Sequence, residues 1–259
     1  MATTETIRRT AHEIFEKVEE SAHQELRRSN HGLAFSGFAG GLTMGLTGIG
    51  VAASTVAMGG GNHEFVPFLF YPVGFIAVII GRAQLFTENT LYPVALVLSE
   101  RRHMVDMLRL WGIVFVCNIL GAVAFAALVI ETDALTPAIH TTLIQLGTTA
   151  VGGSSSHIFW SGVIGGWIIA LVAWLVTASH WTIGQVVMIW LLAFLVGVGH
   201  FSHCIASTAE IMSAVFAGSV PFSRYLVWLS LATTGNIIGG VSMVTMLNFG
   251  QVKAGEESY

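Results

Sequence analysis

The amino-acid sequence predicts an all-α integral membrane protein with six transmembrane helices, built as an inverted repeat of three plus three. Of its 259 residues, 54% are hydrophobic and 10% are charged, whereas soluble proteins carry about 25% charged residues. The chain also repeats itself: Ser-Gly-x-x-Gly-Gly at 36–41 recurs at 161–166, and Asn-x-x-Gly at 118–121 recurs at 236–239. Two copies with an odd number of crossings enter the membrane from opposite sides, which makes the repeat inverted.

The first predicted element is an amphipathic helix over residues 4–29. Ile7, Ala11, Ile14 and Val18 recur at helical spacing, with charged residues on the remaining faces. We therefore assign residues 1–30 to a cytoplasmic amphipathic N-terminal helix, 31–250 to the transmembrane domain and 251–259 to a short cytoplasmic tail.

The second set of elements is six apolar spans. A spanning helix needs about 20 residues, so the second and fifth spans are too long for one straight helix. Each also contains a polar interruption, at 81–89 and at 199–207. We expect both helices to be broken near the midplane, where unwound backbone is tolerated only against protein or water. The spans are 32–58, 66–98, 108–131, 158–178, 183–217 and 225–248.

The placement of positive charge predicts the orientation. Nine of the eleven Lys and Arg residues precede the first span, lie between the second and third or at the very start of the third, or follow the last. This asymmetry is typical of cytoplasmic segments. It predicts a multi-pass protein of the cell (inner) membrane, surrounded by lipid, with both termini cytoplasmic. The net charge of −4 offers no basic surface for nucleic acid.

Polar groups inside a membrane are costly, so each one is a candidate for function. His203 is the strongest, because it lies in the second interruption and an imidazole can give or take a proton near neutrality. A histidine that is merely hydrogen-bonded in the packing is the alternative. Thr87 lies in the first interruption, where it could bond the imidazole, contact a solute or cap the following half-helix.

Other buried polar residues are expected to support the fold. Arg82 is expected to pair with Glu88 or Glu210, because a lone charge at that depth is costly; attraction of an anion is the alternative. Asn118 and Asn236 are expected to bond backbone freed by the broken helices.

A metal site and an enzyme are both disfavoured. His200, His203 and Cys204 would share one helical face, a spacing that suits Cu or Zn. Only these three ligands are local, so we predict no metal and no other cofactor. The sequence also lacks a strand-linked phosphate loop, a Gly-x-Ser-x-Gly elbow and a His-Glu-x-x-His pair, so we predict no enzymatic activity.

The two interruptions and the third span contain Gly-x-x-x-Leu-Phe-Thr at 81–87, Asn-x-x-Gly at 118–121 and Phe-x-His-x-Ile-Ala at 201–206. In this order, these motifs resemble the formate/nitrite transporter family. The run Leu-Phe-Thr-Glu-Asn-Thr at 85–90 is most similar to its YfdC-like branch. The resemblance covers roughly residues 30–250. It implies an aquaporin-like channel domain, a homopentamer, and one pore in each protomer that passes a small monovalent anion such as formate or nitrite, often with a proton.

The resemblance also implies roles for individual residues. His203 would be the central histidine and Thr87 its neighbour. The family's usual lysine in the connection before the fourth span is missing, since lysine occurs only at 17 and 253. Two rival interpretations stay open: a non-conducting membrane sensor or structural protein, and a facilitator of neutral solutes or metal ions. The remaining residues of the implied solute pathway are Leu85, Phe86, Tyr71, Phe75 and Ser207.

Overall fold

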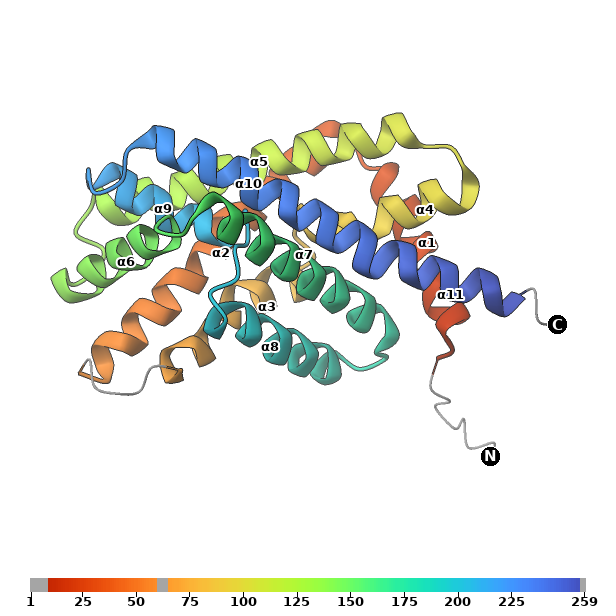
Figure 1. The fold of residues 1–259 in the computed structure, drawn as a ribbon, viewed down its shortest axis with the longest axis horizontal. Coiled ribbons are helices and arrows are strands. Elements are labelled where there is room, and N and C mark those ends of the chain that lie inside the picture. Colours follow the sequence, from red (N-terminus) through yellow and green to blue (C-terminus); the bar gives the residue numbers. More distant parts are fainter. Residues whose placement is uncertain (1–8, 60–64, 257–259) are drawn as a thin grey trace.

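The computed structural model describes residues 9–59 and 65–256, and in this part of the chain helices are joined by non-helical segments, with no strand (Figure 1). Both described chain ends lie at the same end of the molecule, beside α1, α4 and α11, while α6 and α9 lie at the opposite end. The helices are α1 (Ala11–Leu26), α2 (Asn30–Ala57), α3 (Pro72–Ile80), α4 (Tyr92–Glu100), α5 (Met104–Ile130), α6 (Pro137–Ala150), α7 (Ser155–Ala178), α8 (Thr182–Val198), α9 (Ala206–Phe216), α10 (Phe222–Gly240) and α11 (Leu247–Glu256).

Four helical stretches in the described residues are long and apolar enough to cross a membrane: Asn30–Ala57, Met104–Ile130, Ser155–Ala178 and Phe222–Gly255. In the last of these, α10 continues through a π-helical segment, Val241–Met246, into α11. The helix therefore runs to Glu256, beyond the residue-250 boundary expected from hydropathy.

These long helices pack in two matching pairs, α2 on α5 and α7 on α10. The shared glycine motif explains how closely they approach. A Cβ atom on Gly41 would lie 1.9 Å from the Asn118 carbonyl oxygen, and one on Gly166 would lie 2.2 Å from the Asn236 carbonyl oxygen. Glycine is therefore required at both crossings, as in other close helix pairs of membrane proteins.

The two longest apolar segments are interrupted at equivalent places. The helix α3 ends at Ile80 and α8 ends at Val198. Each is followed by a glycine, Gly81 or Gly199, and then by a residue in the left-handed conformation, Arg82 (φ 59°) or His200 (φ 51°). A residue whose backbone is in this conformation turns the chain out of the helical path. Helical structure resumes with a short 3-10 helix, Glu88–Thr90, and α4 after the first interruption, and with α9 after the second.

Two buried asparagines hold the interrupted backbone. The Asn118 amide donates to the carbonyl oxygens of Gly37 (2.6 Å) and Gln84 (2.9 Å), and its oxygen accepts from the Phe86 amide (2.9 Å). The contacts with Gln84 and Phe86 satisfy backbone groups of the interruption that no helix can pair, and the contact with Gly37 ties the interruption to α2.

Asn236 makes the same three contacts in the second half. Its amide donates to Gly162 (2.7 Å) and Ser202 (2.9 Å), and its oxygen accepts from the Cys204 amide (2.9 Å). The sequence motifs thus match contact by contact.

Two helices differ from the sequence-based expectation. The helix α6 lies in the connection 132–157, where no helix is predicted, because its threonines and Gln145 keep its hydropathy low. It packs on α9 and α2. The helix α1 begins at Ala11, where Thr10 and Glu13 form a capping box; residues 4–8 of the predicted helix lie outside the described residues.

Candidate functional site

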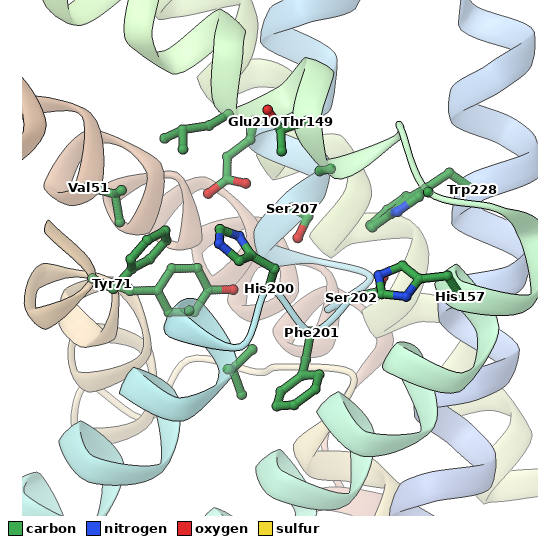
Figure 2. Close-up of a pocket in the computed structure, with 16 residues that line it drawn as sticks. Val51, Tyr71, Thr149, His157, His200, Phe201, Ser202, Ser207, Glu210 and Trp228 are labelled. Atoms are coloured by element: carbon green, nitrogen blue, oxygen red, sulfur yellow. The ribbon is translucent and has the colours of Figure 1, made fainter. Parts of the chain in front are cut away.

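Two cavities lie on either side of the interrupted segments. The larger, about 190 Å³, is lined by residues that include Tyr71, His157, His200, Ser207 and Glu210. Figure 2 shows the polar ends of Tyr71, His200, Ser207 and Glu210 directed toward the same space. It combines imidazole, hydroxyl and carboxyl groups with aromatic walls.

The smaller cavity, about 60 Å³, lies where α1 meets the first interruption. Its lining includes Glu25 of α1 together with Arg82, Gln84, Leu85 and Glu88. It is therefore the more highly charged of the two, with a guanidinium facing a space that also holds carboxyl groups.

The length of α3 gives the distance between the two cavities. Tyr71, just before its start, lines the larger cavity, and Ile79, near its end, lines the smaller one. Eight residues of helix rise about 12 Å. Phe75 lies between them, lines neither cavity and is fully buried. The two cavities are thus separated by a layer of buried side chains.

The polar centre of this layer is one hydrogen bond between the two interruptions. Thr87 Oγ1 lies 2.8 Å from His203 Nε2, and both side chains are fully buried. The Phe75 ring packs edge-on against the imidazole, with ring centroids 5.0 Å apart. A hydrogen bond between Thr87 and the imidazole was one of the alternatives that the sequence left open. The structure forms it between residues 116 positions apart in the chain.

The partners of His203 define its tautomer. Its Nδ1 accepts a hydrogen bond from the Ala206 backbone N–H at 3.0 Å. A neutral imidazole accepts at one nitrogen and donates at the other, so Nε2 carries the hydrogen and donates it to Thr87. Ala206 is also the first residue of α9, and the N-terminus of a helix carries partial positive charge. The site therefore holds a neutral imidazole beside a weakly electropositive backbone.

The other residues predicted for the pathway divide between the two cavities and the layer. Tyr71 and Ser207 line the larger cavity, and Leu85 lines the smaller one. Phe86 lines neither: its ring packs on Trp111 and Phe115 of α5, with centroids 5.6 and 4.9 Å away. The contacts of Phe86 are thus those of a core residue.

The expected ion pair of Arg82 is not formed. In the described part of the chain, no salt bridge joins Arg82 to Glu88 or Glu210. Arg82 is exposed at the end of α3, and Glu210 lines the other cavity. Because Arg82 is exposed and lines the smaller cavity together with Glu25 and Glu88, it is not a lone charge in an apolar interior.

The triad considered for metal binding does not assemble. Residues 199–205 are not helical, so the helical spacing of His200, His203 and Cys204 does not apply. The His200 ring packs on Phe68 in the larger cavity, with centroids 5.0 Å apart, whereas His203 bonds Thr87. These three residues form no metal-ligand group among the described residues.

His157 is a site residue that the sequence analysis overlooks. It lies in the first turn of α7 and lines the larger cavity. It belongs to the connection before the fourth predicted span, where the family usually has a lysine and this chain has none. A search of that connection for any group able to carry positive charge would have found it. The helix α6 contributes Leu146, Thr149 and Ala150 to the same lining.

Comparison with known proteins identifies the family. The model of the formate/nitrite transporter family matches residues 12–250. The chain belongs to the formate/nitrite transporter family. It is 31% identical to the Inner membrane protein YfdC of Escherichia coli (strain K12), an alignment that covers 93% of this chain and 78% of the relative. The predicted family and branch are therefore confirmed.

A second relative and the solved structures are similar to this chain as well. The chain is 32% identical to a Probable formate transporter of Methanothermobacter thermautotrophicus, over 68% of this chain and 71% of that protein. Among solved structures, it resembles an "FNT family ion channel", with a TM-score of 0.81 at 18% identity, covering 92% of this chain and 98% of the other.

It also resembles a "Pentameric formate channel with formate bound", with a TM-score of 0.68 at 17% identity, covering 90% of this chain and 98% of the other. These likenesses establish the fold. The protein is thus a helical membrane protein of a transporter family.

Proposed function

We propose that the chain crosses the membrane six times as an inverted 3+3 repeat and conducts small monovalent anions of weak acids, such as formate, together with a proton. The observation that carries this proposal is the buried Thr87–His203 bond between two cavities, formed by the two interrupted segments. The formate-bound channel with the same fold supports the choice of substrate.

The apolar surroundings of the pair favour a neutral species. Moving an isolated carboxylate from water into an apolar medium costs far more free energy than moving its neutral acid. Phe75 and the other fully buried walls provide such a medium. An anion that takes up a proton in either cavity would therefore meet a lower barrier than the bare anion.

The donors at the centre would guide the entering solute. The Nε2–H of His203 and the hydroxyl of Thr87 are hydrogen-bond donors, and a carboxylate oxygen is their natural acceptor. The N-terminus of α9 adds partial positive charge at the same place. Together these groups would hold an anion until it is protonated.

The histidine can carry a proton only after one contact opens. In an imidazolium both ring nitrogens donate, whereas Nδ1 of His203 faces the Ala206 N–H, which is also a donor. We therefore propose that proton linkage through His203 involves release of this bond at the start of α9.

Orientation and assembly follow the same proposal. Arg109 donates to the carbonyl oxygens of Leu26 and Arg28, so the positive segments before α2 and before α5 are adjacent. This grouping supports a cytoplasmic position for that end, and for both termini, in the inner membrane. A homopentamer is proposed from the pentameric channel of the same fold.

The test is uptake of formate into proteoliposomes at two pH values, with a neutral solute as control. We expect saturable formate flux that rises at the lower pH, and a flattened pH profile in His203→Ala. An unchanged profile in that variant would remove the relay role of His203. Absence of flux from folded wild-type protein would instead favour the non-conducting sensor, and flux of the neutral solute alone would favour a neutral facilitator.

A further inference from the structure

We propose that His23, Glu100 and His103 form a binding site for a divalent transition-metal ion that fixes α1 to the connection between α4 and α5. His23 lies in the last turn of α1, Glu100 ends α4, and His103 precedes α5. Their ligand atoms all lie within 4.8 Å of one another. This inference is independent of the proposed transport.

The three side chains already converge on one carboxylate. Nε2 of His23 lies 2.8 Å from Glu100 Oε1, and Nε2 of His103 lies 3.2 Å from Glu100 Oε2. The two imidazoles meet edge-on, with centroids 5.9 Å apart. Two imidazoles and one carboxylate suit Zn²⁺ and related first-row ions and leave a coordination position for water. Ligand atoms of a tetrahedral zinc site lie about 3.4 Å apart, so a small rearrangement of these half-buried side chains is enough to place all three around one ion.

A second contact orients one of the imidazoles. Nδ1 of His103 faces Asp106 Oδ2 at 3.4 Å. Histidines that bind metal through one ring nitrogen commonly donate the other N–H to a carboxylate, which fixes the tautomer and raises the basicity of the ligand. With the hydrogen on Nδ1, Nε2 of His103 carries a lone pair that can bind the ion in place of its present contact with Glu100.

The backbone of the connection is held in a costly conformation at this place. Arg101 (φ 53°) and His103 (φ 69°) both adopt left-handed conformations without being glycine. Non-glycine residues in this conformation are strained and collect at functional sites. Here the conformation of His103 directs its ring to Glu100.

One competing contact is present. Nε of Arg102 lies 2.5 Å from Glu100 Oε2. Arg102 is exposed, and Oε1, which faces His23, remains available for the ion. Metal binding therefore requires no loss of the Arg102 contact.

Metal binding would also restrain the wall of the smaller cavity. Ser21 and Glu25, on either side of His23 in α1, line that cavity. Gln84 in the first interruption donates to Glu25 at 2.8 Å. An ion at His23 would therefore hold in place the helix that covers this cavity.

The test uses the full-length protein purified without an affinity tag and freed of metal by a chelator. Titration calorimetry with Zn²⁺ is expected to give one ion per protomer in the wild type. The affinity should fall more than tenfold in His23→Gln and in His103→Asn, where Asn tolerates the left-handed backbone. Asp106→Asn should lower it by about 10–100-fold, the usual effect of losing such an outer contact. His31→Gln, an exposed histidine at the start of α2, is the matched control and should bind as the wild type.

A second readout and a substitute variant keep the result decisive. Electron paramagnetic resonance of the Cu²⁺-loaded wild type should show two nitrogen ligands, reduced to one in His23→Gln. If either histidine variant fails to fold in the presence of chelator, the isosteric Glu100→Gln replaces it. The proposal is overturned if folded wild type binds no Zn²⁺, if its Cu²⁺ spectrum lacks two nitrogens, or if the His23 and His103 variants bind as His31→Gln does.

Discussion

Replacement of Asn118 by aspartate tests whether the buried asparagines hold the interrupted helices together. The carboxyl has the shape of the amide and keeps an oxygen for the Phe86 N–H. It loses the N–H donors that bond the carbonyl oxygens of Gly37 and Gln84. A buried acceptor left without its donor costs about 1–3 kcal/mol. Gln84 lies outside any helix and its carbonyl is such an acceptor, whereas the Gly37 carbonyl lies within α2. We therefore expect Asn118→Asp to lower the free energy of unfolding by about 1–3 kcal/mol.

The second half of the chain provides an internal replicate. Asn236 is likewise fully buried and bonds Gly162, Ser202 and Cys204 in the same pattern. Asn236→Asp should therefore cost as much as Asn118→Asp. The control is Asn248→Asp in α11, whose amide makes one bond, to the Val244 carbonyl oxygen, at a partly exposed position. This loss should cost about 1 kcal/mol.

The assay is unfolding by SDS in mixed micelles, followed through the intrinsic fluorescence of the protein's seven tryptophans. The size and monodispersity of each variant are checked beforehand by gel filtration. Midpoints for Asn118→Asp and Asn236→Asp that match Asn248→Asp would refute the structural role of the amides. A large effect in only one of the first two would refute the energetic equivalence of the halves.

Three further predictions follow from the same contacts. Thr87→Val should lower formate flux in proteoliposomes about tenfold or more, since a buried hydrogen bond is worth about 1–3 kcal/mol, whereas Thr87→Ser should retain it; equal flux in both variants would contradict the role of the hydroxyl. Gly166→Ala would place a Cβ 2.2 Å from a carbonyl oxygen of α10 and should abolish stable expression, while Gly112→Ala, with open space around it, should stabilise α5 by about 1 kcal/mol, as read from unfolding midpoints. Hydrogen bonds from the Thr10 backbone amide and hydroxyl hold the pKa of Glu13 below its usual range; this contribution to α1 stability is present above the unfolded-state pKa and is lost as the pH falls through the lower folded-state value. Amide exchange of the first turn of α1, corrected for its intrinsic pH dependence, should therefore rise on acidification in the wild type but not in Glu13→Ala.

The sequence by itself determined the features that depend on local pattern. Apolar runs and the low charge content fixed a helical membrane protein, because only a helix satisfies its own backbone in lipid. The interruptions at 81–89 and 199–207 were visible because polar residues break the apolar runs there. The family was recognisable from motifs in these same segments.

The tertiary structure decided which distant residues meet. Only the packing of the two interruptions brings Thr87 to His203, and only the α9 backbone selects the tautomer of that imidazole. Hydropathy could not reveal α6, whose polar residues resemble those of a loop. Nor could it show that Phe86 turns toward α5.

The convergence of His23 with Glu100 and His103 has the same origin. In a membrane protein nearly every helix face is apolar, so periodicity does not distinguish a face that packs on protein from one that meets lipid. Which residues meet across tens of positions of the chain is then determined by close helix packing at glycines and by hydrogen bonds to the backbone of the interruptions. Those contacts exist only in the folded chain.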